Sequence, residues 1–111
     1  MDKNFGIEYL MEFTQADAVI ILASDGKLID AVNLKQSETV AEASRGMFDI
    51  AERFSKSITN GSVQQLIIRS QDGIYIAHRM ANKNIVVAFA KDTSKYGMIA
   101  LTMDRISGNV F

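Results

Sequence analysis

The chain contains 111 residues, of which 48% are hydrophobic and 23% are charged, with a formal net charge of −1. This length and composition fit one folded domain and argue against two domains or a disordered chain. The absence of cysteine excludes disulfide bonds, thiolate metal sites and cysteine nucleophiles.

Charge and hydropathy patterning also limit where the chain can act. Lysine and arginine are scattered singly from Lys3 to Arg105, so the sequence has no basic stripe for nucleic acid. The longest apolar runs, residues 18–23 and 85–90, are far shorter than the ~20 residues that span a bilayer. Residues 1–13 lack a basic leader followed by an apolar run. We therefore expect one cytoplasmic domain over residues 1–111, without a nucleic-acid partner and without direct membrane insertion.

The first elements are a helix and a strand. Residues 5–13 predict a helix, because their apolar side chains recur at helical spacing and Asp2 or Asn4 can cap its start. Residues 18–23 are apolar at every position, which predicts a strand that is covered on both faces.

A hairpin follows the first strand. The pair Asp25-Gly26 is typical of a two-residue type I′ turn. The return strand, residues 28–34, carries Asp30 and Asn33 among its apolar side chains, and such polar interruptions suit an edge strand.

The longest periodic segment, residues 37–59, predicts a long helix. Thr39 and Glu42 match a capping box at its start. Asn60-Gly61 tolerates the left-handed conformation that ends helices. One apolar stripe of this helix is expected to face the sheet: Val40, Met47, Ala51, Phe54 and Ile58.

Three strand-like runs and a last helix complete the chain. The runs are residues 63–70, 74–80 and 85–90, and turn-forming residues such as Asp72-Gly73 separate them. Residues 94–107 have apolar side chains at helical spacing. The candidate caps of this helix are Asp92, Thr93 or Ser94 at its start and Gly108-Asn109 at its end.

The order of elements predicts an α+β fold. Every direct strand-to-strand link is a short hairpin, so the five-stranded sheet must be mainly antiparallel. The first and fifth strands are apolar on both faces and belong side by side in the middle, which gives the spatial order 2-1-5-4-3. The long helix covers one face and the terminal helices cover the other, in a three-layer α-β-α sandwich.

The third strand is a problem as a free edge of this sheet. Leu66, Ile67 and Ile68 are consecutive and apolar, and no proline blunts the edge, although Arg69 flanks the run. Such an edge favours pairing with a second copy across a two-fold axis.

The long helix also points to a second copy. Beside its sheet-facing stripe runs a row of mostly small residues: Thr39, Ala43, Gly46 and Ile50. Gly46 costs about 1 kcal/mol in a helix interior relative to alanine, so it is either a site of close helix approach or a tolerated surface glycine. On the other flank, Phe48 is either part of a partner-binding surface or buried against its own sheet.

The sequence resembles the roadblock/dynein light chain family, including its MglB-like prokaryotic members. The resemblance covers nearly the whole chain and is best over residues 17–97. It depends on the order and spacing of these motifs: the apolar run 18–23, the Asp25-Gly26 turn, the helix 39–58, the run 66–68, the Asp72-Gly73 turn, the strand 85–90 and Gly97.

The resemblance implies a homodimeric, non-catalytic scaffold that binds a small Ras-like GTPase or a larger assembly. Carried over to this sequence, the dimer interface comprises Thr39, Ala43, Gly46, Ile50, Leu66, Ile67 and Ile68. The implied partner platform comprises Arg45, Phe48 and Glu52. The chain ends shortly after its last helix and is expected to lack the terminal extensions with which some family members hold partners.

Two other functions stay open on the sequence alone. Sheet-and-helix domains of this size can hold a small molecule between their layers, which makes a sensor domain the main alternative. An enzyme that uses His78 and Arg79 is the other, although no residue is spaced to act as a partner for His78. The sequence has no phosphate-binding Gly-x-x-x-x-Gly-Lys and no metal-ligand motif, so we expect no cofactor and no metal.

Overall fold

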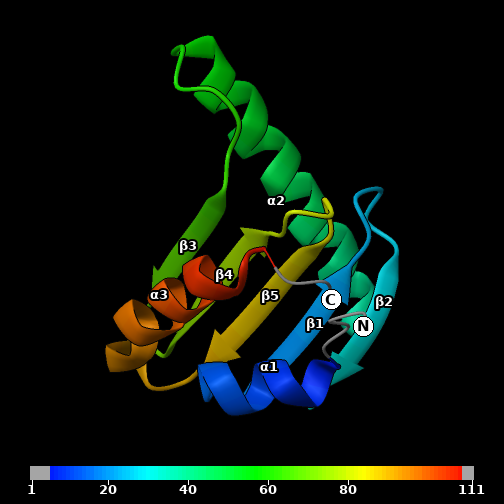
Figure 1. Cartoon of the computed structure of the whole chain (residues 1–111), viewed down its shortest axis with the longest axis vertical. Coiled ribbons are helices and arrows are strands. Elements are labelled where there is room, and N and C mark those ends of the chain that lie inside the picture. Colours follow the sequence, from blue (N-terminus) through cyan, green and yellow to red (C-terminus); the bar gives the residue numbers. More distant parts are fainter. Residues whose placement is uncertain (1–5, 109–111) are drawn as a thin grey trace.

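The computed structural model describes residues 6–108, which form a five-stranded antiparallel sheet with helices on both faces (Figure 1). The elements in chain order are α1 (Ile7–Thr14), β1 (Ala18–Leu22), β2 (Leu28–Val32), α2 (Ser37–Ser57), β3 (Gln65–Ser70), β4 (Gly73–Arg79), β5 (Ile85–Ala90), the 3₁₀ helix η1 (Thr93–Lys95) and α3 (Tyr96–Ile106). The strand order is β2-β1-β5-β4-β3, which confirms the predicted topology.

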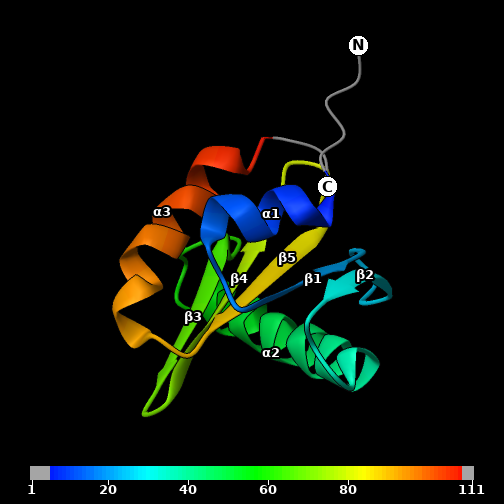
Figure 2. The same ribbon diagram turned by 90° about the horizontal axis from the view of Figure 1, so that it is seen from below.

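The sheet separates the hydrophobic core into two clusters, one on each face. Along β1, Val19 and Ile21 pack in the cluster that contains the residues of α1 and α3, whereas Ile20 and Leu22 pack in the cluster that contains the residues of α2. Period-2 alternation therefore supplies both layers from one wholly apolar strand. Figure 2 shows α1 and α3 on one side of the sheet and α2 on the other, as the sequence predicts.

The two free edges of the sheet differ in their protection. The pairing of β2 with β1 shifts register beside Leu22, and Asp30 is exposed on β2. Irregularities and charges of this kind discourage further pairing. β3 pairs regularly with β4 along its whole length, so its outer edge is straight and open.

The loop of the first hairpin is longer than the predicted two-residue type I′ turn, so that prediction is wrong. The Gly26 N–H donates to the Ala23 carbonyl at 2.9 Å, and the Ala23 N–H donates to the Lys27 carbonyl at 2.8 Å, so the loop has three residues. Gly26 has a φ of 90°, whereas Asp25 does not have a positive φ. The Asp25 carboxylate accepts the Lys27 N–H at 3.0 Å, and this bond favours the three-residue turn with a left-handed glycine.

The predicted capping box of α2 is also wrong. The helix begins at Ser37, two residues before Thr39, and Gln36 precedes it in a left-handed conformation without a side-chain cap. Asp92 does cap the last helical segment, because its carboxylate accepts the Ser94 N–H at 3.0 Å. The candidate caps Asp2 and Asn4 and the stop residue Asn109 lie outside the described residues.

Candidate protein-interaction surface

The sheet-facing side of α2 is set by small and aromatic residues. Ala41, Ser44 and Phe48 are buried, and Phe48 is only 1% exposed. Phe48 therefore cannot contact a partner, and the expectation that it belongs to a partner platform is wrong. The guanidinium of Arg79, on β4, lies over the Phe48 ring at 4.9 Å and closes this side of the core.

The C-terminal half of α2 presents apolar side chains that its own sheet does not cover. Phe54 is 65% exposed and Ile58 is 47% exposed, so their predicted place on the sheet-facing stripe is wrong. Figure 1 gives the reason, since this half of the helix projects beyond the ends of the strands. Both residues continue the row predicted beside the stripe, because Ile50, Phe54 and Ile58 are spaced four residues apart.

Two parts of the chain thus carry apolar side chains that are exposed in residues 6–108. We call the exposed face of α2 the apolar row; it comprises Thr39, Ala43, Gly46, Ile50, Phe54 and Ile58. We call the free side of β3 the open edge; it comprises Leu66, Ile67 and Ile68. Leu66 is half-buried, whereas Ile67 and Ile68 are exposed. A β-strand edge of this kind carries unpaired backbone donors and acceptors that favour pairing with another chain.

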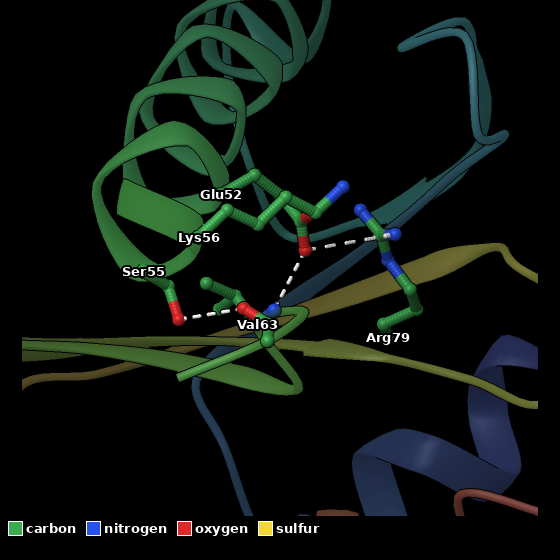
Figure 3. Close-up of polar contacts among 6 residues, drawn as sticks. Glu52, Ser55, Lys56, Val63 and Arg79 are labelled. Atoms are coloured by element: carbon green, nitrogen blue, oxygen red, sulfur yellow. Dashed lines mark hydrogen bonds and ion pairs between the residues drawn. The ribbon is translucent and has the colours of Figure 1, made fainter. Parts of the chain in front are cut away.

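Glu52 holds the end of α2 to the segment that leads into β3 (Figure 3). Its carboxylate accepts the Val63 N–H at 2.6 Å and lies 3.3 Å from the Lys56 ammonium and 4.0 Å from the Arg79 guanidinium. The Ser55 hydroxyl donates to the Gly61 carbonyl at 2.7 Å in the same place. Glu52 is thus engaged within its own chain, and we assign it a positioning role rather than the predicted partner contact.

The Val63 N–H holds the pKa of Glu52 below its ordinary value of 4.5, and the nearby cations act in the same direction. A lowered folded pKa means that the stabilisation is complete above the ordinary value and is lost as the pH falls through the folded value. We expect Glu52→Gln to lower the free energy of unfolding by about 1–2 kcal/mol at neutral pH, since a neutral acceptor replaces a charged one. Urea denaturation measures this, and the difference from wild type should vanish in acid.

Asp49→Asn is the matched control for Glu52→Gln. Asp49 lies on the same helix and pairs with Arg45 at 3.7 Å, but both side chains are more than half exposed. An exposed pair of this kind contributes about 0–1 kcal/mol, so its loss should be barely measurable. Equal effects of the two substitutions would contradict the positioning role of Glu52.

Arg45, the third predicted platform residue, is exposed on α2. Its side chain packs across Gly26, where an added Cβ would collide with it. The first hairpin therefore supports Arg45, which is the most exposed of the three residues predicted for the platform.

His78 and Arg79 do not form a common site. The His78 ring is buried, and its Nδ1 accepts a hydrogen bond from the Gln65 amide at 3.0 Å on the α3 side of the sheet. The Arg79 side chain contacts Glu52 and Phe48 on the α2 side. Burial lowers the pKa of His78, which keeps the ring neutral. The arrangement offers no accessible general base next to Arg79.

Three properties of the described residues bear on the remaining alternatives. No His, Asp and Glu side chains among residues 6–108 gather closely enough to hold a metal ion. No helix in this part of the chain has the length and apolarity needed to cross a bilayer. A shallow hollow of about 590 Å³ lies beside the β3–β4 turn and is lined by residues that include Leu34, Tyr75 and Phe89.

Several solved structures share this fold. MglB from Myxococcus xanthus is 15% identical, with a TM-score of 0.78 over 89% of this chain and 83% of that chain. The gliding protein MglB from Thermus thermophilus is 14% identical, with a TM-score of 0.80 over 91% and 79%. A Roadblock/LC7 domain from Streptomyces avermitilis is 12% identical, with a TM-score of 0.69 over 88% and 92%.

The relationship to known proteins is visible in the structure but not in the sequence. No family model matches the chain, and no curated protein matches it in sequence. The structural likeness confirms the predicted fold, which is that of the roadblock domain and of MglB.

Proposed function

We propose that the chain is a homodimeric, non-catalytic scaffold whose paired α2 helices present a platform to a small Ras-like GTPase. Two observations carry the dimer: the open edge of β3 and the apolar row of α2. Both surfaces carry large aliphatic or aromatic side chains that are between 36% (Ile68) and 65% (Phe54) exposed within residues 6–108. A second copy fits both at once, since a two-fold axis sets each surface against its own equivalent.

The difference between the two sheet edges supports this choice of edge. β2 has a register shift and an exposed carboxylate at Asp30, whereas β3 has neither. Antiparallel pairing of β3 with its equivalent would satisfy its unpaired backbone groups and extend the sheet through both chains.

The GTPase partner is supported by the fold and by the surface left on α2. The resemblance to the roadblock family implies such a partner, and the fold is shared with MglB. Arg45 and Asp49 remain exposed on α2 for polar contacts. The test is recovery of proteins from the native lysate with the immobilised dimer, with GTP and GDP analogues in parallel. Recovery of no Ras-like GTPase in any nucleotide state would contradict the GTPase part and leave the dimer standing.

Gly46→Ala tests whether the two α2 helices approach closely at this glycine. An added Cβ at Gly46 meets nothing within 4 Å in its own chain, so alanine should stabilise the helix by about 1 kcal/mol. If the partner's helix packs there, the same methyl group overpacks the interface by about 1–3 kcal/mol, and the dimer dissociation constant should rise about tenfold. Sedimentation equilibrium measures the constant.

Gly97→Ala is the control, because Gly97 is also an exposed helical glycine with nothing within 4 Å of an added Cβ. Its dimer dissociation constant should match that of wild type. If Gly46→Ala dimerises as well as Gly97→Ala, Gly46 is an ordinary surface glycine.

A small-molecule sensor is the second candidate, and the hollow beside the β3–β4 turn is the observation that favours it. Its lining includes the Tyr75 and Phe89 rings, which meet edge to face at 5.4 Å. Apolar walls of this size suit a small ligand. Mass spectrometry of the purified protein under native conditions would detect a retained ligand, and Phe89→Ala should abolish its retention. A ligand-free protein would leave the scaffold as the only supported function.

A further inference from the structure

The backbone of β3 limits how a second copy can pair with it. The Arg79 N–H donates to the Gln64 carbonyl at 2.9 Å, so Gln64 directs its backbone groups toward β4. The pairing of β3 with β4 is regular, and the direction of these groups alternates along an antiparallel strand. Gln65, Ile67 and Arg69 therefore direct their N–H and C=O groups to the open edge. Only these residues of β3 can form the hydrogen bonds of an added strand.

The side chains of the same three residues lie on the α3 side of the sheet. The Gln65 amide donates to the Ala100 carbonyl of α3 at 3.2 Å. The Arg69 guanidinium lies 4.7 Å from the centre of the Tyr96 ring, at the start of α3. Ile67 lies midway between Gln65 and Arg69 and shares their side of the strand.

The remaining apolar residues of the open edge face α2. Leu66 packs in the core cluster that contains the residues of α2, and Ile68 lies two residues further along the same side of the strand. Residues that are directly opposite in an antiparallel pair point to the same face of the sheet. Ile67 can therefore lie opposite only Gln65, Ile67 or Arg69 of a second copy.

The apolar residues favour one of these three registers. With Ile67 opposite Ile67 of the second copy, Leu66 lies opposite Ile68, and Gln65 lies opposite Arg69. A shift to either neighbouring register sets Ile67 opposite a polar residue and also moves Leu66 or Ile68 opposite one. Only the register centred on Ile67 therefore buries all three apolar residues against apolar residues.

Asp104 lies on the flank of α3 that faces β3. It continues an i,i+4 row from Tyr96 and Ala100, which both contact side chains of β3. Its charge also acts on the His78 ring, where it opposes the lowering of the His78 pKa by burial. The His78 ring is hydrogen-bonded to Gln65 at 3.0 Å, so Asp104 belongs to the Gln65 end of β3.

Opposite charges thus lie at the two ends of the open edge, with Arg69 at one end and Asp104 at the other. Both residues are exposed, and neither forms an ion pair within residues 6–108. A two-fold axis sets the Arg69 end of one chain against the Gln65 end of the other. Each Arg69 then lies beside the Asp104 of the second copy. A shift that sets Arg69 opposite Ile67 would move it about 7 Å along the strand from Gln65.

We propose that two β3 strands pair with Ile67 at the two-fold axis, and that α3 joins the interface through an ion pair between Asp104 of each chain and Arg69 of the other. The surface is self-complementary, so its occupant is a second copy of the chain. This interface rests on the proposed function for the pairing of β3, and it adds α3 to the contacts of α2 and β3.

Disulfide formation between single-cysteine variants tests the register, since the chain has no cysteine of its own. In the proposed register Leu66 of one copy is directly opposite Ile68 of the other, with Cα atoms about 4.5 Å apart, which suits a disulfide. An oxidised mixture of Leu66→Cys and Ile68→Cys should give a linked dimer in non-reducing electrophoresis. Each variant alone should stay unlinked, because its two cysteines lie about 8 Å apart, which is too far for a disulfide.

The outcomes separate the register from the proposed function. A linked dimer from Leu66→Cys alone or Ile68→Cys alone would overturn the register and keep the pairing of β3. If both reduced variants sediment as dimers and no sample becomes linked, the register is overturned and the dimer uses another surface. A wild-type chain that sediments as a monomer would contradict the proposed dimer itself.

A charge swap tests the contribution of α3. Asp104→Arg and Arg69→Asp should each raise the dimer dissociation constant about tenfold, because like charges replace both symmetric ion pairs. The double variant should restore dimerisation. Arg105→Asp is the matched control, because Arg105 is exposed about 100° around α3 from Asp104, and its constant should match wild type. A double variant that dimerises no better than the single variants would overturn the pairing of Asp104 with Arg69.

Discussion

Ile67→Lys should convert the dilute dimer into a folded monomer. The side chain is 41% exposed in the isolated chain, so lysine can replace it without disturbing the core. At the interface the change removes an apolar residue from each copy and places two like charges near the two-fold axis. Loss of this burial costs about 2–3 kcal/mol over both copies, which corresponds to a dissociation constant about 100-fold higher. Sedimentation velocity would show the halved mass, and circular dichroism would show the retained helices.

Ile29→Lys provides the control for this experiment. Ile29 is an exposed isoleucine on β2, the other free edge of the same sheet, and the substitution is identical. Because β2 is irregular and carries Asp30, it should not pair, and Ile29→Lys should sediment as wild type. A normal dimer for Ile67→Lys would exclude the open edge from the interface.

The strand order could be predicted because few arrangements satisfy the pattern of the sequence. Two strands, β1 and β5, are apolar at nearly every position, and only central strands have both faces covered. Three short hairpin links then allow only antiparallel neighbours. The exposed Ile67 and Ile68 of β3 were predicted for the same reason, since the order leaves β3 at an edge.

The sequence could not predict which side of α2 faces the sheet, because helical periodicity does not show how far the sheet extends under the helix. The sequence places Phe54 on the sheet-facing stripe and Phe48 beside it, whereas the structure exposes Phe54 and buries Phe48. The buried residues of the helix, Ala41, Ser44 and Phe48, all lie in its first 12 residues, and its second half projects past the strands (Figure 1). One signal was available: Gly46, Ile50, Phe54 and Ile58 form an unbroken i,i+4 row, which a single chain has no reason to keep apolar.

The contacts of Glu52 were hidden from the sequence for another reason. Its hydrogen-bond donor is the backbone N–H of Val63, eleven residues along the chain and beyond the turn that follows α2. Every residue except proline has a backbone N–H, so the sequence does not indicate which one Glu52 accepts from. From the sequence, a carboxylate on the side of a helix is equally consistent with a contact to a partner protein and with a contact inside its own chain. Only the geometry of the turn after α2 distinguishes the two roles.

Phe48→Ala should cause a large loss of stability. The side chain is fully buried between α2 and the sheet, and truncation of a buried phenylalanine costs about 3–5 kcal/mol. The Arg79 guanidinium also loses the ring it lies over, while its Nε has no hydrogen-bond partner within residues 6–108. The total is a large part of the roughly 5–15 kcal/mol typical of a domain. Urea denaturation in the Ile67→Lys background measures it without a contribution from dimerisation.

Phe54→Ala makes the opposite prediction on the same helix. Phe54 is 65% exposed, so its truncation should change the unfolding free energy of the monomer by less than about 1 kcal/mol. Without the Ile67→Lys substitution, Phe54→Ala should weaken the dimer, because Phe54 lies in the apolar row. The two phenylalanines thus separate folding from association. Phe48→Ala should lower the unfolding free energy of the monomer and leave dimerisation of the folded protein unchanged, whereas Phe54→Ala should weaken only the dimer. If Phe54→Ala lowered monomer stability as much as Phe48→Ala, its side chain would be part of the core and the apolar row would end at Ile50.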